Sequence, residues 1–470
     1  MRSVTRRNFC QAAAAGAAWA AACPTALSDG PMSGKIDDGG SLPRPTARQL
    51  AWQDLELGMF IHFGMATFSG NVWATPSPDT YAPARLDTDQ WMEAAQAFGA
   101  KYAVFTAKHC AGFMQWQTDL YPYSVKQSKW RSGKGDVLKE FVESCHKYGI
   151  KPGIYVSATA NAYWGARRCR VQGGKESQAK YSRMVEKMCE EVWSRYGDFT
   201  EIWFDGGVMP PRMGGPDIWG LQQKLQPSAI VHDNGAGPHG HQRWGGSESG
   251  GVGYPCWATV RNRHTQFEPA PSAGPKDVLH MMKHGHPDGD LWLPAEADPT
   301  FNGRWFPAKG KMAAPRSLNN LMKIYYESVG RNANLLLNCS PGPDGLVAES
   351  HMKRYEEFGR EIRRRFGNPV AETQGVGDTV ELALKTPARI DHVILMEDIA
   401  HGERVREYAI EGLVSGNKWE KLGDGLSIGH KRIQGFEPAE VARVRFRATK
   451  AVASPMIRRL AVFSTSEGAS

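Results

Sequence analysis

Several features of other protein classes are missing from this sequence. After the N-terminus no run of eighteen apolar residues occurs, which excludes a membrane-spanning helix in the body of the chain. The eight cysteines form no CxxC pair, so the zinc and redox motifs built on that pair are absent. No HExxH and no nucleic-acid-binding motif is present, and the first predicted strand is not followed by a GxGxxG turn, since the chain reads "HFGMATFSG" there. We therefore expect no metal, no cofactor and no nucleic-acid partner.

The formal net charge of +8 does not by itself indicate an anionic partner. Lys and Arg are spread along the chain, and their densest cluster is "REIRRRFG" at residues 360–367. This cluster is typical of the last turn of a helix, where cations complement the helix dipole. We therefore expect it to be structural.

The first 30 residues are predicted to be an export signal. Arg6 and Arg7 precede a short alanine-rich apolar stretch and then a polar segment with Pro and Gly, the layout of a signal peptide. The twin arginine resembles a bacterial Tat leader. A Gly- and Pro-containing linker follows over residues 31–45. We expect a periplasmic or secreted protein.

The cysteines fit that route. Cys23 ends an "AAAC" run that could carry a lipid, but the Leu usual three residues earlier is missing, which favours simple cleavage near Ala22. The Tat route exports folded proteins, in which scattered cysteines are more often free core thiols than disulfides. The cysteines outside the leader are Cys110, Cys145, Cys169, Cys189, Cys256 and Cys339.

A repeating pattern predicts the fold of residues 46–367. A helix capped near residues 87–89 ends at Gly99 and leads into an apolar strand, and the pattern recurs with Asp136 as cap and Gly149 as stop, then with Gly197 as stop. Continuously apolar strands with crossover helices indicate a parallel sheet covered on both faces. The number of repeats favours a (β/α)8-like TIM barrel over an open doubly wound sheet.

The composition changes near Gly367. From residue 368 to 470 the chain consists of short alternating segments, such as "IDHVILME" and "VARVRFRAT", separated by turns. This pattern predicts a C-terminal antiparallel β-sandwich.

Polar residues end several of the predicted barrel strands. In parallel barrels the active site lies at the carboxyl ends of the strands. His62, the pair Lys108 and His109, and Asp205 each follow an apolar run. In "EIWFDGG" the strand would hold Asp205 rigidly, and the two glycines leave room for a ligand beside it. These residues are the candidate active site.

A second carboxylate would complete a glycosidase. Glu248 lies 43 positions after Asp205 in a Gly- and Ser-rich loop, although a solvated loop glutamate would look the same. Two carboxylates about 5 Å apart make a retaining glycosidase, in which one attacks the anomeric carbon and the other protonates the leaving oxygen. Apolar faces for sugar C–H groups would come from the tryptophans near strand ends, Trp73, Trp116, Trp203, Trp292 and Trp305.

The motifs at these positions resemble glycoside hydrolase family 29, the retaining α-L-fucosidases. The resemblance covers residues 45–367 and includes "LGMFIHFGMATF", "YAVFTAKHCAGFMQW", "EIWFDGG", "HDNGAGPHGHQRWGGSESG", "LWLPAEAD" and "SVGRNANLLLNCSPGPDG". It implies that Asp205 is the nucleophile and that His62, His109 and Trp203 bind fucose. The form RWxGxExG resembles the α-1,3/1,4-fucosidase branch, which implies Glu248 as acid/base. Glu296 in "LPAEAD" is the reserve candidate.

Three residues depart from the family pattern, in which Val72 would be Glu, Cys110 would be His and Thr159 would be Trp. The first two changes remove polar groups expected to hold sugar hydroxyls. The alternatives that stay open are a glycosidase for another sugar of similar configuration and a non-catalytic glycan-binding protein. A metallohydrolase using His62, His109 and "HMMKHGH" at residues 280–286 is disfavoured, because no HExxH or similar spacing occurs.

The partner implied by the resemblance is a fucosylated oligosaccharide or glycoconjugate. The C-terminal segment resembles a discoidin-type, galactose-binding sandwich, and such a module often packs on the barrel in this family. The sequence does not predict the oligomeric state.

Overall fold

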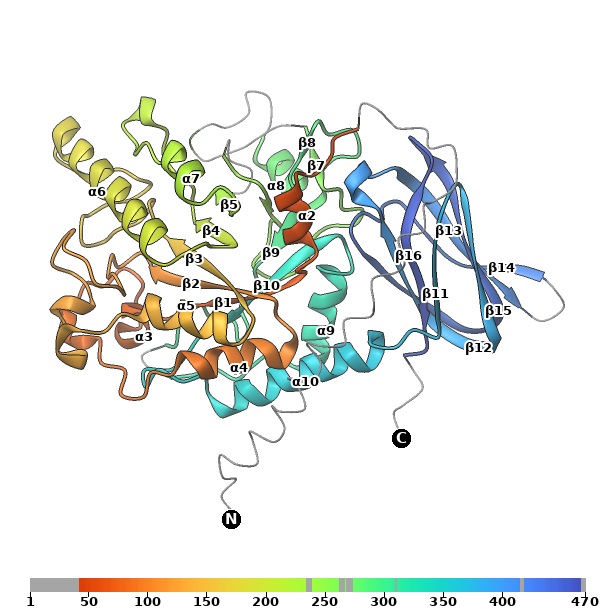
Figure 1. Cartoon of the computed structure of the whole chain (residues 1–470), viewed down its shortest axis with the longest axis horizontal. Helices are drawn as coiled ribbons and strands as arrows, with labels where there is room; N and C mark the ends of the chain where they lie inside the picture. The colour runs from red at the N-terminus through yellow and green to blue at the C-terminus, as the bar shows by residue number, and fades with distance from the viewer. Residues whose placement is uncertain are drawn as a thin grey trace, which may run out of the picture. The chain divides into compact units, whose positions relative to one another are not determined.

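The computed structural model describes residues 42–233, 239–261, 267, 274–308, 311–414 and 418–465 (Figure 1). The predicted leader over residues 1–30, and the predicted linker as far as residue 41, lie outside the described residues. The described chain contains a parallel sheet with helices around it, followed by an antiparallel sheet.

The parallel sheet has eight strands and is nearly closed into a barrel. All neighbouring pairs that the sheet records run parallel, in the order β5-β4-β3-β2-β1-β10-β9-β6. The two end strands approach each other, because the backbone N–H of His241, just before β6, donates to the carbonyl of Val231 in β5 at 2.9 Å. The strands are β1 (Leu57–Ile61), β2 (Tyr102–Lys108), β3 (Lys151–Val156), β4 (Glu201–Phe204), β5 (Ile230–Asp233), β6 (Arg243–Trp244), β9 (Ala295–Ala297) and β10 (Ala333–Cys339).

Helices follow most of these strands. The predicted caps are confirmed, since the Asp87 carboxylate accepts from the N–H groups of Asp89 and Gln90 and the Asp136 carboxylate accepts from that of Lys139. None of the described helices is both long and apolar enough to cross a bilayer. The helices are α2 (Ala47–Gln53), α3 (Met65–Ser69), α4 (Thr88–Phe98), α5 (Val137–Lys147), α6 (Gly174–Arg195), α7 (Trp219–Leu225), α8 (Pro275–His284), α9 (Leu318–Glu327) and α10 (Glu349–Phe366).

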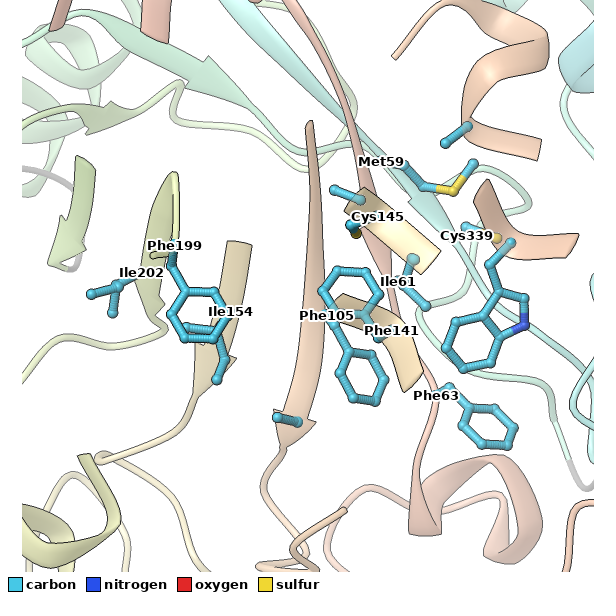
Figure 2. Packing of buried hydrophobic residues seen from close by; sticks show 14 of the residues in the cluster. Met59, Ile61, Phe63, Phe105, Phe141, Cys145, Ile154, Phe199, Ile202 and Cys339 are labelled. Atoms are coloured by element: carbon cyan, nitrogen blue, oxygen red, sulfur yellow. The ribbon is translucent and has the colours of Figure 1, made fainter. Parts of the chain in front are cut away.

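Successive residues of β1 face two different cores. Met59 and Ile61 belong to the large cluster between the strands and the helices, together with Phe105, Phe141 and other side chains seen in Figure 2. Phe60 belongs to a separate cluster inside the barrel, with Tyr102, Tyr155 and Trp203 among its members. This division explains why the strand is buried at every position and was readable as a continuous apolar run.

The C-terminal antiparallel sheet has six strands in the order β11-β16-β12-β15-β13-β14. Its two long strands, β12 and β15, contain irregularities in their pairing, at which such strands bend. A core of its own lies within this sheet. The predicted fold class, a barrel followed by antiparallel β structure, is confirmed. The strands are β11 (Ala371–Val376), β12 (Thr379–Glu397), β13 (Val405–Val414), β14 (Lys418–Gly425), β15 (Arg432–Ala451) and β16 (Met456–Phe463), and β7 (Thr259–Val260) pairs with β8 (Leu291–Trp292) in a separate ribbon.

Hydrogen bonds and ion pairs join this sheet to the barrel. The carboxylate of Glu403 accepts from the backbone N–H of Ala258 at 3.0 Å and from the side chain of Asn332 at 2.6 Å. Glu56, which precedes β1, pairs with His430 and Lys431. The six cysteines outside the predicted leader are free and buried, as the sequence favours.

Candidate active site

Asp205 stands at the carboxyl end of β4, followed by two glycines with φ of 70° and 72°. This left-handed backbone favours glycine, so it explains the sequence "DGG". The hydroxyl of Tyr155 donates to Oδ2 of Asp205 at 3.2 Å. Although solvent reaches the residue, the surrounding protein raises the pKa of its carboxyl, and the hydrogen bond from Tyr155 partly offsets the rise. The tip of β4 therefore presents a carboxyl whose pKa is set by burial and by the hydrogen bond from Tyr155.

His62 and His109 follow β1 and β2 and have ring centroids 5.9 Å apart. Burial lowers the pKa of His62 to about 3 and that of His109 well below its usual value, so both imidazoles are neutral. The Nδ1 atom of each is buried and has no hydrogen-bond partner in the protein. Unpaired buried nitrogens are costly unless a ligand supplies the partner.

Tyr155 links these histidines to Asp205. Its ring stacks on His109 with centroids 5.2 Å apart, and its hydroxyl contacts Asp205. Strand register places Tyr155 beside Trp203 and Trp203 beside His232, whose ring stacks on the indole at 3.7 Å. Sequence reasoning missed Tyr155 and His232. Alternation along the strand "GIYVS" was the available signal, since it places Tyr155 on the inner face with the other aromatic residues.

Glu296, the reserve acid/base candidate, lies inside the barrel rather than at its mouth. It is 1% exposed and accepts hydrogen bonds from the hydroxyl of Tyr102 at 2.8 Å and from Nε1 of Trp203 at 2.9 Å. Its carboxyl is also hydrogen-bonded to that of the buried Glu201. Its contacts hold Trp203 in place.

Glu248 lies on an exposed turn after β6. The turn is anchored where the N–H of Gly245 donates to the carbonyl of Glu296 at 2.7 Å. Gly250 packs so close to Pro299 and Ile324 that a Cβ would meet them. Burial raises the pKa of Asp298 well above its usual value, and the charges of Glu296 and then of Glu248 add to the rise, so Glu248 lies near Asp298. The exposed carboxyl of Glu248 thus stands at the mouth of the barrel, and β5 lies between its strand, β6, and β4.

The predicted tryptophans occupy different surroundings. Trp305 is half-buried, with its ring 4.7 Å from that of His62, and Trp203 lies in the same inner cluster. Trp73 is also half-buried and stacks under the guanidinium of Arg167 at 3.9 Å. By contrast, Trp116 has no exposed surface and donates to Glu191 at 3.1 Å, so its ring is part of the core.

Phe306 is another residue of the site that the sequence analysis did not identify. Its ring lies 5.3 Å from that of His62 and 5.0 Å from that of His109. The segment that contains it has no strand or helix pattern, so periodicity gave no signal. Phe306 therefore packs against both histidines, and Trp305 packs against His62.

The three departures from the family pattern all lie in this region. Thr159 bonds through its hydroxyl to the carbonyl oxygens of Asp205 at 2.7 Å and Gly207 at 2.6 Å. Burial and then the charge of Asp205 raise the pKa of the Cys110 thiol to about 12, so the thiol is neutral. Val72 lines a hollow of about 10 Å³ beside His109.

Histidines on α8 do not form a metal centre. His280 and His284 stack with centroids 4.4 Å apart. Within the part of the chain that the structure describes, no group of three His, Cys, Asp or Glu residues is arranged to hold a metal ion.

The chain is similar to several known proteins of one family. The family described as Alpha-L-fucosidase matches residues 76–365. The putative alpha-L-fucosidase 1 of Oryza sativa subsp. japonica is 31% identical, over 90% of this chain and 86% of the rice protein. Alpha-L-fucosidase 1 of Arabidopsis thaliana is 29% identical, over 90% of this chain and 88% of the plant protein.

Solved structures agree with these relatives. A putative alpha-L-fucosidase from Bacteroides thetaiotaomicron VPI-5482 superposes with a TM-score of 0.84 at 39% identity, covering 90% of this chain and 99% of that chain. A glycoside hydrolase 29 family member from an unknown rumen bacterium gives a TM-score of 0.77 at 29% identity, covering 91% of this chain and 78% of that chain. The chain therefore belongs to glycoside hydrolase family 29, the α-L-fucosidases, as its motifs predict.

Proposed function

We propose that this enzyme removes terminal α-linked L-fucose from glycans with retention of anomeric configuration. The observation that carries the proposal is the arrangement around Asp205. Its carboxylate is held by Tyr155, beside His62 and His109, whose buried Nδ1 atoms lack protein partners. Two neutral imidazoles can bind sugar hydroxyls without adding charge near the anomeric carbon. Trp305 and Trp203 supply apolar surface for the sugar ring.

The proposed reaction has two displacements. Asp205 attacks the anomeric carbon while Glu248, in its protonated form, donates its proton to the departing glycosidic oxygen. This step forms a glycosyl-enzyme ester. Glu248 then takes a proton from water, which attacks the same carbon and releases fucose and the Asp205 carboxylate. An exposed turn suits Glu248, because it must reach the leaving group and then water.

The preferred linkage in this proposal is α-1,3 or α-1,4. Its support is the RWxGxExG form at residues 243–250, which ends on the tight turn bearing Glu248. Comparing hydrolysis of α-1,2-, α-1,3- and α-1,4-fucosylated trisaccharides tests it. Equal rates on the three, or a preference for the α-1,2 linkage, would contradict it.

Trapping of the intermediate tests the mechanism. A 2-deoxy-2-fluoro-α-L-fucosyl donor with a good leaving group should label Asp205, and NMR should show the α-anomer of fucose released first. Asp205→Asn should lower kcat/KM on an aryl α-L-fucoside by about 10⁴-fold. Asp198→Asn, an exposed carboxylate before the same strand, is the matched control and should change little. Initial release of the β-anomer would refute the double displacement.

A second candidate, another sugar of similar configuration, is favoured by the hollow beside His109. Val72 offers no hydrogen bond there, so the site could accept a different substituent on the ring. A panel of aryl glycosides decides between them. The main proposal requires the fucoside to have the highest kcat/KM, and a higher value for another glycoside would replace it.

The leader carries a separate proposal, export by the Tat route. Its support is the Arg6-Arg7 pair before the alanine-rich stretch. Arg6→Lys with Arg7→Lys should retain the protein in the cytoplasm of a Tat-competent host, whereas Cys23→Ser should still be exported and cleaved. Unchanged export of the double variant would exclude the Tat route, and loss of membrane attachment in Cys23→Ser would instead indicate a lipoprotein.

A further inference from the structure

Three arginines project from a hairpin at the carboxyl end of β3. The N–H of Arg167 donates to the carbonyl of Arg170 and the N–H of Arg170 to that of Arg167, each at 3.0 Å. The two residues between them, Arg168 and Cys169, have φ of 48° and 60°. Two successive positive φ values define a type I′ turn, which usually contains Asn and Gly. The backbone of this turn is therefore strained at Arg168 and Cys169.

The hydrogen-bonded pairing fixes the directions of two of these side chains. Directly opposed residues of an antiparallel pair project from the same face of the ribbon. The guanidinium groups of Arg167 and Arg170 therefore share one face, on which like charges repel each other. A bound anion would relieve that repulsion.

The hairpin is attached to the catalytic end of β4. The buried Cys169 donates its N–H to the carbonyl of Thr159 at 2.9 Å, and the Thr159 hydroxyl bonds to the carbonyl of Asp205 at 2.7 Å. On its other side, the Arg167 guanidinium lies over the ring of Trp73, in the loop after α3. Arg167 is also near enough to Cys110, at the end of β2, to influence its thiol. The arginines thus stand beside the sugar site.

These three charges lack an acidic partner among the residues that the structure describes. Among the described residues, none of Arg167, Arg168 and Arg170 has an ion-pair partner within 4.0 Å, and all three are exposed. Elsewhere in this protein exposed arginines are commonly paired, as Arg85 is with Asp344 and Arg131 with Glu140. A cationic face with a bare surface next to the nucleophile is suited to binding part of the substrate.

We infer that the Arg167–Arg170 hairpin forms a subsite for an anionic group, a carboxylate or sulfate, on the residue to which the fucose is attached. The inference rests on the proposed function, because it places the leaving part of the substrate beside the Asp205 site. Guanidinium groups match both anions, since their planar donors bind two oxygens at once. Neutral aglycones would still bind, without that contribution.

The test compares three 4-nitrophenyl α-L-fucosides, one neutral, one with a carboxylate on the aryl ring and one with a sulfate ester there. The double variant Arg168→Gln/Arg170→Gln keeps the contact of Arg167 with Trp73. It should lower kcat/KM on the charged substrates by about tenfold, the combined effect of two exposed charge interactions, and alter the neutral one less than about twofold. Lys385→Gln/Arg389→Gln removes the same charge from exposed positions on β12 and is the matched control.

A second experiment uses the wild-type enzyme alone. Raising NaCl from about 20 mM to about 500 mM should lower the wild-type kcat/KM on the charged substrates far more than on the neutral one, because salt screens exposed charges. An equal loss on all three substrates, or no loss on the charged ones, would overturn the subsite. If only one anion responds, the subsite is specific for it. If the wild type cleaves none of the three fucosides, the proposed function fails instead.

Discussion

The indole Nε1 of Trp203 donates a hydrogen bond of 2.9 Å to Oε2 of Glu296. The other carboxylate oxygen of Glu296 accepts from the hydroxyl of Tyr102 at 2.8 Å. The indole of Trp203 also stacks on the ring of His232, with centroids 3.7 Å apart. Glu296 thus has both oxygens engaged by side chains inside the barrel. We therefore expect Glu296 to act as a positioning residue for Trp203, and in the proposed mechanism Glu248 transfers the proton.

The two glutamates should differ in their dependence on the leaving group. Glu248→Ala should lower kcat/KM by about 10²- to 10⁴-fold on a fucoside with a poor leaving group, and much less on a dinitrophenyl fucoside, which needs no protonation. Glu296→Gln should affect both substrates in the same proportion, because it disturbs the position of Trp203. Rates on the two substrates measure this difference. A leaving-group-dependent loss in Glu296→Gln would make it the acid instead.

Tyr155 should set the acid limb of the pH profile. In the proposed mechanism Asp205 must be ionised to attack, and burial raises the pKa of its carboxyl while the hydrogen bond from Tyr155 lowers it. Tyr155→Phe removes the lowering contribution, so activity should be lost at a higher pH as pH falls. The pH dependence of kcat/KM reports this pKa. Tyr148→Phe, whose hydroxyl bonds Glu93 on the outer helices, should leave the limb unmoved, and an unmoved limb in Tyr155→Phe would contradict the prediction.

Substitutions of Trp116 and Trp305, both predicted to bind the sugar, should have different effects on stability and on KM. Trp116→Leu loses a fully buried ring and its hydrogen bond to Glu191, so it should lower the free energy of unfolding by about 3 kcal/mol with KM unchanged. Trp305→Leu removes a half-buried ring beside His62 and should raise KM with little change in stability. Denaturant unfolding and steady-state kinetics test both. A raised KM in the folded Trp116 variant would return that residue to the site.

Much of this arrangement was predictable because strand ends are marked in the sequence. Each of His62, His109 and Asp205 follows a largely apolar run that the structure buries at every position, and the structure places all three at the carboxyl ends of barrel strands, β1, β2 and β4. Helix caps and glycine stops fixed the crossover helices in the same way. Both signals are local, so one sequence was sufficient to read them.

Other parts depend on packing that a local pattern does not encode. Nothing near Trp116 distinguishes a core indole from one facing a sugar, because that depends on α6 lying over it. Tyr155 is a site residue only because strand register sets it beside Trp203. The sequence indicates Glu296 as a carboxylate near a strand end, but its hydrogen bonds come from side chains on β2 and β4. Such contacts are long-range in sequence.

The buried pair of Glu201 and Glu296 should give stability a distinctive pH dependence. Burial and then the charge of Glu296 raise the pKa of Glu201 well above its usual value, so Glu201 stays protonated in the folded protein and donates to Glu296. Above the pKa of the unfolded carboxyl, about 4.3, the folded state binds one more proton than the unfolded state. The free energy of unfolding should therefore fall as pH rises, by up to about 1.4 kcal/mol per pH unit from this group.

Glu201→Gln isolates that contribution, because an amide can donate to Glu296 as the protonated acid does but does not titrate. The variant should match the wild type near pH 4 and exceed its free energy of unfolding increasingly up to pH 8. Glu190→Gln, on the exposed side of α6, is the matched control and should follow the wild type throughout. Urea unfolding at a series of pH values measures all three. Parallel curves for Glu201→Gln and the wild type would show that Glu201 is ionised in the fold, and the buried carboxyls would then need another source of compensation.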